Sequence, residues 1–97
     1  GDGLRISRSS GMVYKNGRAL ELSAREFDIL CFLAASPGRV FSREELMEHV
    51  WGYDYYGDLR AVDVAIRRLR EKIEDEPASP RYIITKRGMG YYFADGE

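Results

Sequence analysis

The sequence predicts an α+β fold, a winged helix-turn-helix in which a small N-terminal antiparallel sheet and three helices precede a C-terminal β-hairpin. Three observations support this prediction. A hairpin signal lies near the start of the chain, two capping-box sequences open helices in the middle, and two β-branched and aromatic runs flank a glycine-containing loop near the end. The 97 residues suffice for one modest hydrophobic core, so we expect a single domain over residues 1–97.

Three short strands are expected at the start of the chain. Asn16 and Gly17 stand between the second and the third strand, and a type I′ turn needs positive φ at both of its central positions. Apolar residues alternate with polar neighbours on either side, which is the period of a half-buried strand. These apolar residues are Leu4 and Ile6, Met12 and Tyr14, and Leu20 and Leu22.

The first two helices open with the spacing of a capping box, in which a Ser hydroxyl and a Glu carboxylate satisfy each other's backbone N–H groups. Ser23 and Glu26 begin a mostly apolar helix that we expect over residues 24–35, before a Ser-Pro-Gly sequence ends it. Ser42 and Glu45 begin a second, short helix. Its apolar residues are Leu46, Met47, Val50 and Trp51.

A third helix is predicted from Asp58 to Glu74, with Asp58 as its N-cap. Apolar residues recur in it at steps of three and four, which places them on one stripe facing a core. They are Leu59, Val62, Ile66, Leu69 and Ile73.

The opposite face of this helix is cationic with small apolar gaps. Arginine can bond guanine in the major groove, arginine and lysine can neutralise phosphates, and small side chains permit contacts with thymine methyl groups. A solvated amphipathic helix is the alternative explanation of the same face. The face consists of Arg60, Ala61, Val64, Arg67, Arg68 and Lys72.

A C-terminal hairpin is expected from the runs 82–85 and 91–93, which flank a loop with two glycines. The tight turn explains the glycines, but it does not require Lys86 and Arg87 beside them. A basic third helix followed by a hairpin with a basic tip is typical of a winged helix. Its third helix enters the major groove of DNA and its hairpin reaches the adjacent minor groove.

Net charge by itself argues against a nucleic-acid partner, because the formal net charge is −1 and the sequence pI is about 5.9. The distribution of charge argues for one. Bases predominate in residues 60–72 and 81–92, whereas acids gather elsewhere. We therefore expect one anionic partner on one face.

Several classes of function are excluded. Cys31 is the only cysteine, so no internal disulfide can form and a reducing compartment is expected. His49 is the only histidine, which leaves no basis for a metal site of several His and Cys ligands, and no catalytic constellation is present. We predict no enzymatic activity, no cofactor and no metal. No apolar run is long enough to cross a membrane.

An alternative function is a winged helix that binds protein. The segment from Trp51 to Gly57 is rich in aromatic residues and would be its contact surface.

Four motifs together resemble the DNA-binding effector domain of OmpR/PhoB-type response regulators of bacterial two-component systems. The motifs are Leu-Ser-Ala-Arg-Glu-Phe at residues 22–27, Val-Trp-Gly at 50–52, the run from Arg60 to Ile73, and Thr-Lys-Arg-Gly-Met-Gly-Tyr at 85–91. Within that family, the loop that begins at Trp51 is similar to that of the WalR (VicR) group.

The resemblance implies a cytoplasmic bacterial transcription regulator whose receiver domain, absent from this chain, is phosphorylated by a histidine kinase. It also implies direct-repeat DNA sites bound by a head-to-tail dimer, with the isolated domain a monomer. A loop in the corresponding place touches RNA polymerase in some members. Its residues here are Tyr53, Asp54, Tyr55 and Tyr56.

The resemblance also assigns roles to single residues. The base contacts in the major groove are Arg68, Val64 and Ala61. The phosphate contacts are Trp51, Arg60, Arg67 and Arg70, to which the cationic face adds Lys72. The wing residue that enters the minor groove is Arg87, with Lys86 and Thr85 beside it. Ala61 and Ala65 stand where members often carry Thr or His.

Arg70 has a second interpretation. Helical geometry places it on the same side as Asp63, so an ion pair of Asp63 with Arg70 or with Arg67 is an alternative to phosphate contact.

Overall fold

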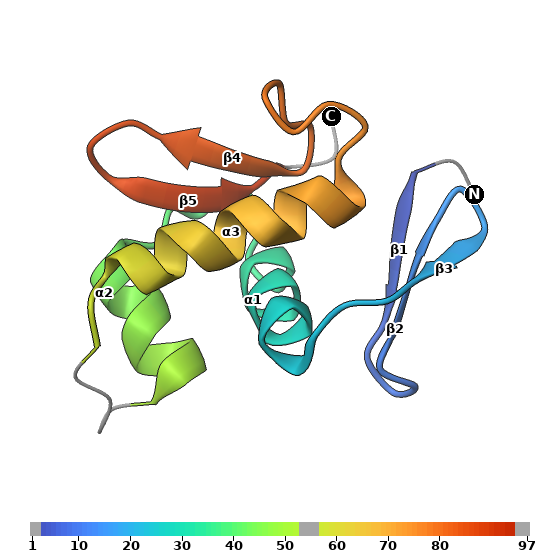
Figure 1. Cartoon of the computed structure of the whole chain (residues 1–97), viewed down its shortest axis with the longest axis horizontal. Helices are drawn as coiled ribbons and strands as arrows, with labels where there is room; N and C mark the ends of the chain where they lie inside the picture. The colour runs from blue at the N-terminus through green and yellow to red at the C-terminus, as the bar shows by residue number, and fades with distance from the viewer. Residues whose placement is uncertain (1–2, 53–56, 95–97) are drawn as a thin grey trace.

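The chain folds around its longest helix, α3, which crosses the front of the molecule in Figure 1. This computed structural model describes residues 3–52 and 57–94. A hairpin lies along one side of α3, α1 lies behind it, and a three-stranded sheet stands near its C-terminal end (Figure 1). The elements are β1 (Leu4–Ser7), β2 (Met12–Lys15), β3 (Arg18–Leu20), α1 (Ala24–Ala34), α2 (Arg43–Leu46), the π-helical turn η1 (Met47–Trp51), α3 (Arg60–Ile73), β4 (Ile83–Lys86) and β5 (Gly90–Phe93).

The N-terminal sheet has the predicted antiparallel order β1-β2-β3. Asn16 and Gly17 have φ values of 52° and 84°, so both central positions of the turn are left-handed as the Asn-Gly sequence predicted. Lys15 pairs with Arg18 across this turn. The third strand ends at Leu20, so the prediction that Leu22 continues it was wrong. Leu22 instead packs on the core from the connection to α1.

Both capping boxes are confirmed. The Ser23 hydroxyl accepts the N–H of Glu26 at 3.1 Å, and the Glu26 carboxylate accepts the N–H of Ser23 at 2.8 Å. Ser42 and Glu45 repeat the arrangement at 3.0 and 2.8 Å. Because these bonds use N–H groups that have no partner inside the helix, they fix where α1 and α2 begin. The first helix ends at Ala34, one residue before the prediction.

The second helix is short, as predicted, and it widens before it ends. Its regular part, α2, has four residues, and η1 continues it as a π-helical turn to Trp51. Gly52 ends the turn with φ at 110°, and its N–H donates to the carbonyls of Met47 and Glu48 at 3.1 Å each. This wide last turn sets the position of Trp51.

The core is built on the apolar stripe of α3. Val62, Ile66, Leu69 and Ile73 are each at most 1 % exposed, as the periodicity predicted. The other buried apolar side chains come from every layer: Val13, Ile29, Leu30, Leu33, Phe41, Leu46, Met47 and Ile83. Burial of this stripe holds the opposite face of α3 toward solvent.

The predicted start of α3 was two residues early. Its N-cap is Leu59 and its first helical residue is Arg60. Asp58 lies outside the helix, but its carboxylate still accepts the N–H of Arg60 at 2.9 Å. The helix ends at Ile73, with Glu74 as its C-cap.

The C-terminal hairpin, here called the wing, consists of β4 and β5 paired from Ile83 and Phe93 to Lys86 and Gly90. Phe41 and Tyr91 join it to the helices through two backbone hydrogen bonds of 2.9 Å. The wing therefore continues a small extended piece between α1 and α2, as well as packing on α3.

Glu74 fixes the start of the wing. It is 5 % exposed, and its carboxylate accepts the backbone N–H groups of Arg81, Tyr82 and Ile83 at 2.6 to 3.1 Å. Hydrogen bonds from several N–H groups compensate the burial of a carboxylate. The sequence alone predicts no role for Glu74 beyond the end of the helix.

We expect Gly90→Ala to disrupt the wing. Gly90 has φ at 146°, and a Cβ there would overlap the Phe41 carbonyl, which is already bonded to Tyr91. Gly88→Ala is the control: its φ is 76°, but among residues 3–52 and 57–94 no atom beyond its chain neighbours lies within 4 Å of its Cβ position. The control should lose only about 1–2 kcal/mol of stability from its left-handed backbone. Thermal denaturation followed by circular dichroism measures both, and equal losses would contradict the expectation.

Candidate nucleic-acid interface

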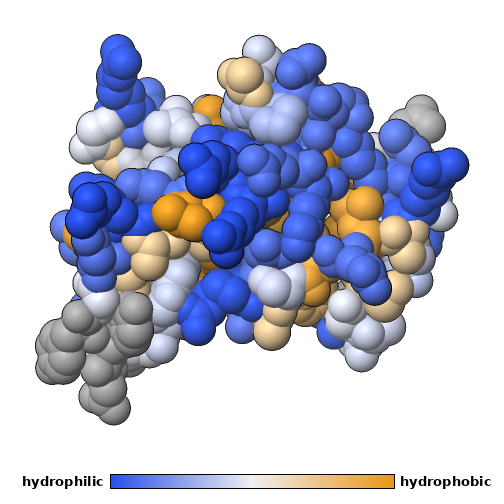
Figure 2. Space-filling model, in the orientation of Figure 1, coloured by the Kyte–Doolittle hydropathy of each residue, from blue (hydrophilic) through white to orange (hydrophobic). Residues whose placement is uncertain are grey.

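Beyond its buried stripe, α3 presents three strips of side chains. We call them the centre strip, which faces solvent, the wing edge and the α1 edge. In Figure 2 the side of the molecule that carries α3 is mostly hydrophilic, with hydrophobic patches among the polar side chains. The centre strip is Arg60, Val64, Arg67 and Glu71; the wing edge is Asp63, Arg70 and Glu74; the α1 edge is Ala61, Ala65, Arg68 and Lys72.

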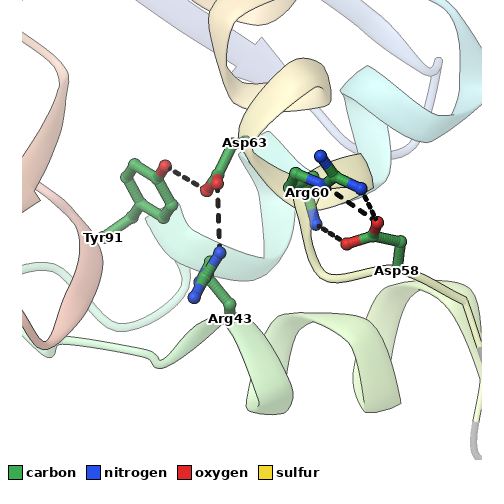
Figure 3. Close-up of polar contacts among 5 residues, drawn as sticks. All are labelled: Arg43, Asp58, Arg60, Asp63 and Tyr91. Carbon is green, nitrogen blue, oxygen red and sulfur yellow. Dashed lines mark hydrogen bonds and ion pairs between the residues drawn. The ribbon is translucent and has the colours of Figure 1, made fainter.

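The centre strip is exposed and mainly cationic. The Arg60 side chain is 83 % exposed and donates two hydrogen bonds to the Asp58 carboxylate, at 2.7 and 2.9 Å (Figure 3). These hydrogen bonds lower the pKa of Asp58. Val64 is 38 % exposed, which is unusual for a branched apolar side chain in this fold. Arg67 is exposed, and so is Glu71, an acid on an otherwise basic strip.

The α1 edge combines an ion pair with an exposed arginine. Lys72 Nζ lies 2.7 Å from Glu26 Oε1, although the sequence analysis had assigned Lys72 to phosphate. Burial raises the pKa of Glu26, but hydrogen bonds from Lys72 and from the Ser23 N–H lower it by more, so the carboxylate stays ionised at neutral pH. Arg68 is exposed beside them.

The wing edge is bound to the protein itself. Tyr91 donates its hydroxyl proton to Asp63 Oδ1 at 2.6 Å, and Arg43 donates to Oδ2 at 3.2 Å (Figure 3). Burial, reinforced by the Asp63 carboxylate, raises the pKa of Tyr91 to about 12. Asp63 therefore joins α2, α3 and β5 at one point.

The alternative pairing of Asp63 with Arg70 or Arg67 does not form, because Asp63 bonds to Arg43 and Tyr91. Arg70 turns instead to β4, where Nε donates to the Ile83 carbonyl at 3.0 Å and Nη2 donates to the Thr85 hydroxyl at 2.7 Å. Its guanidinium also lies 5.5 Å from the Tyr91 ring centroid. The helical wheel placed Arg70 on the same side of the helix as Asp63 but could not show that the wing supplies acceptors there.

The tip of the wing is exposed and basic. Thr85, Lys86 and Arg87 are all exposed, and Met89 beside them is 59 % exposed. In the described part of the chain, no ion pair engages the Lys86 or Arg87 side chain. Their charges are available to a partner outside the molecule.

Trp51 ends η1 and lies against an arginine that the sequence analysis did not select. The Arg25 guanidinium carbon is 4.3 Å from the centroid of the Trp51 ring. Arg25 was overlooked because residues 23–26 were interpreted only as a helix start. The sequence also did not reveal the pairing of Glu26 with Lys72 or the roles of Arg43 and Tyr91, since these partners are distant in the chain.

Other candidate residues have structural roles or lie outside the described residues. The His49 ring stacks on Phe32 with centroids 5.0 Å apart, and burial raises the pKa of the half-buried Cys31. Among residues 3–52 and 57–94, no cluster of His, Cys, Asp and Glu could hold a metal ion, and no helix could cross a bilayer. The aromatic loop residues Tyr53, Asp54, Tyr55 and Tyr56 lie outside the described residues.

A family model described as "Transcriptional regulatory protein, C terminal" matches residues 17–93. The chain belongs to this family. Its strand and helix order is the winged-helix fold of OmpR/PhoB-type DNA-binding domains, as the motifs predicted. The family is one of transcriptional regulatory proteins, and the RstA and AdeR structures are DNA-binding domains in complex with DNA.

Three solved structures illustrate the similarity. The response regulator DrrB, a Thermotoga maritima OmpR/PhoB homologue, has a TM-score of 0.90 and 42% identity over 97% of this chain and 42% of its own. The Klebsiella pneumoniae RstA DNA-binding domain in complex with the RstA box has a TM-score of 0.85 and 39% identity. The match covers 95% of this chain and 91% of the RstA domain. The AdeR DNA-binding domain in complex with an intercistronic region has a TM-score of 0.81 and 28% identity. The match covers 98% of this chain and 97% of the AdeR domain. This chain thus spans about two fifths of DrrB.

Tyr91→Phe is expected to destabilise this family member by about 1–3 kcal/mol at pH 7, because Asp63 loses its short hydroxyl donor. The folded-state pKa of Tyr91 is about 12, above its ordinary value of 10. The stabilisation is therefore complete below pH 10 and is lost as the pH rises toward 12.

Urea unfolding at pH 7 and at pH 11 measures this difference between wild type and variant. Tyr92→Phe is the control, because within residues 3–52 and 57–94 nothing bonds to its hydroxyl. A loss in the control equal to that of Tyr91→Phe would show that the bond to Asp63 contributes nothing.

Proposed function

We propose that this chain binds specific sequences in double-stranded DNA, as the effector domain of a response regulator that controls transcription. The observation that supports this proposal most directly is that α3 and the wing are bonded together through Arg70 and Thr85 and that both present exposed cations. Family membership and the DNA complexes of RstA and AdeR support the same function. A net charge of −1 is small, so the segregated bases can still give this face a positive potential.

In this proposal α3 lies in the major groove and reads bases with Arg68, Val64 and Ala61. An arginine can donate two hydrogen bonds to one guanine, and small apolar side chains can contact thymine methyl groups. The 38 % exposure of Val64 supports this role, because an apolar group in water gains by contact with a methyl.

Phosphate contacts are assigned to Arg60, Arg67 and Trp51. Arg60 is held by Asp58, but an exposed ion pair of this kind is weak and can be exchanged for a phosphate. Arg70 and Lys72 are bonded to the wing and to Glu26, so they reach phosphate only by giving up these bonds. We therefore assign Arg70 first to the positioning of the wing.

The wing is assigned to the minor groove. Arg87 enters it, and Lys86 and Thr85 flank the entry point. A narrow, A·T-rich minor groove has an enhanced negative potential, so it attracts an arginine at the tip of a hairpin.

The proposal for the whole protein goes further. A phosphorylated receiver domain would control this domain, two copies would bind direct repeats head to tail, and the isolated domain would be a monomer. Residues 53–56 would contact RNA polymerase, and the protein would work in the bacterial cytoplasm. These parts rest on the resemblance to OmpR/PhoB-type response regulators; of one such homologue, DrrB, this chain spans 42%.

Selection from random duplex DNA, followed by titration of single and tandem sites across a salt series, tests the function. We expect direct repeats to be selected and log K to fall steeply with log salt, because each phosphate contact releases counterions. Absence of binding at low salt would favour the alternative function, in which the segment from Trp51 to Gly57 binds a protein partner.

Arg68→Ala is expected to cost about 1–3 kcal/mol on the selected site and little on random DNA. Arg18→Ala is the control, because it removes the same charge from β3, outside the proposed interface. Fluorescence anisotropy measures both DNAs. If Arg68→Ala weakens both equally, Arg68 is a phosphate contact and not a base contact.

A further inference from the structure

A hollow of about 340 Å³ opens between the α1 edge of α3 and the starting turn of α1. Three elements contribute to it, the beginning of α1, the end of η1 and the exposed side of α3. It adjoins the proposed DNA-reading surface, because all three proposed base contacts line it. The lining residues are Ser23, Arg25, Glu26, Trp51, Ala61, Val64, Ala65 and Arg68.

Arg25 and Trp51 form one wall of this hollow. With its central carbon 4.3 Å from the ring centroid, the guanidinium is within range of a cation–π contact with the indole. That contact engages its face and leaves the N–H donors at its rim for oxygen atoms of an anion. Within residues 3–52 and 57–94, no carboxylate pairs with Arg25.

The charge balance of the hollow favours an anion. Glu26 is the acid in its lining, and its carboxylate is 2.7 Å from Lys72 Nζ and accepts the Ser23 N–H. This acid is therefore compensated inside the protein, whereas no ion pair among residues 3–52 and 57–94 engages Arg25 or Arg68. The two arginines leave the hollow with an excess of positive charge.

The orientation of α3 in the proposed complex indicates that the anion is a DNA phosphate. A helix in the major groove lies between two phosphate backbones, and its two edges face opposite walls of the groove. The wing edge is already bonded to the wing through Asp63, Arg70 and Glu74. The α1 edge faces the other wall, where a hollow with exposed arginines is open.

We propose that Arg25 and Trp51 together bind a backbone phosphate of the DNA strand that lines the major groove on the side away from the wing. This inference rests on the proposed DNA binding and adds Arg25 to its contacts. The cation–π contact holds the guanidinium in place before DNA arrives, so less side-chain entropy is lost on binding.

The test is DNA binding by the Arg25→Gln variant across a salt series, on the selected site and on random DNA. We expect affinity to fall by about tenfold on both DNAs, the equivalent of one charge-assisted hydrogen bond. The salt slope should shrink by about 0.9, because one phosphate contact is lost. Arg5→Gln is the matched control: Arg5 lies 4.9 Å from the Tyr14 ring on the N-terminal sheet, so it removes one charge and one similar contact elsewhere.

Tryptophan fluorescence reports on the surroundings of the Trp51 ring, including its contact with Arg25, because Trp51 is the only tryptophan in the chain. Arg25→Lys keeps the charge and should retain the salt slope. Suppose that Arg25→Gln lowers DNA affinity and alters Trp51 emission but leaves the slope of log K against log salt unchanged. Arg25 then only positions Trp51, and the proposal is overturned. Wild-type affinity in Arg25→Gln would overturn it as well, without touching the proposed function. Failure of the wild type to bind DNA would overturn both.

Discussion

Three side chains on one edge of α3 hold the wing, and the geometry of the whole interface depends on them. Asp63 accepts from Tyr91, Arg70 donates to β4, and Glu74 accepts three successive N–H groups where β4 begins. They are seven and four residues apart, so they follow one line along the helix. Because the same helix carries the proposed base contacts, the wing tip is held at a fixed distance from them.

This arrangement explains why net charge was a poor guide to the partner. Glu26, Asp63 and Glu74 are counted as three negative charges, yet each is bonded to groups of the protein. The cations on the centre strip and at the wing tip mostly point outward. Glu26 and Asp63 are also paired with the cations Lys72 and Arg43, whereas the exposed arginines present their charge directly to solvent.

Much of the fold could be predicted because its signals are local. The capping boxes at Ser23 and Ser42, the Asn16-Gly17 turn and the apolar stripe of α3 each depend on residues within a few positions of one another. The errors occurred where local signals compete. Asp58 was expected to cap α3, but the helix starts two residues later, with the Asp58 carboxylate on the N–H of Arg60.

By itself, the sequence determined the order of elements, the buried stripe and the cationic face, since periodicity and capping are encoded in neighbouring residues. Only the tertiary structure decided which polar side chains stay exposed and which bond to other parts of the protein. Arg70 and Lys72 looked like phosphate contacts until β4 and Glu26 were placed beside them, and Arg25 became a candidate once Trp51 lay against it. The reason is distance along the chain: these partners are 13, 46 and 26 residues apart, and only packing of the core brings them together.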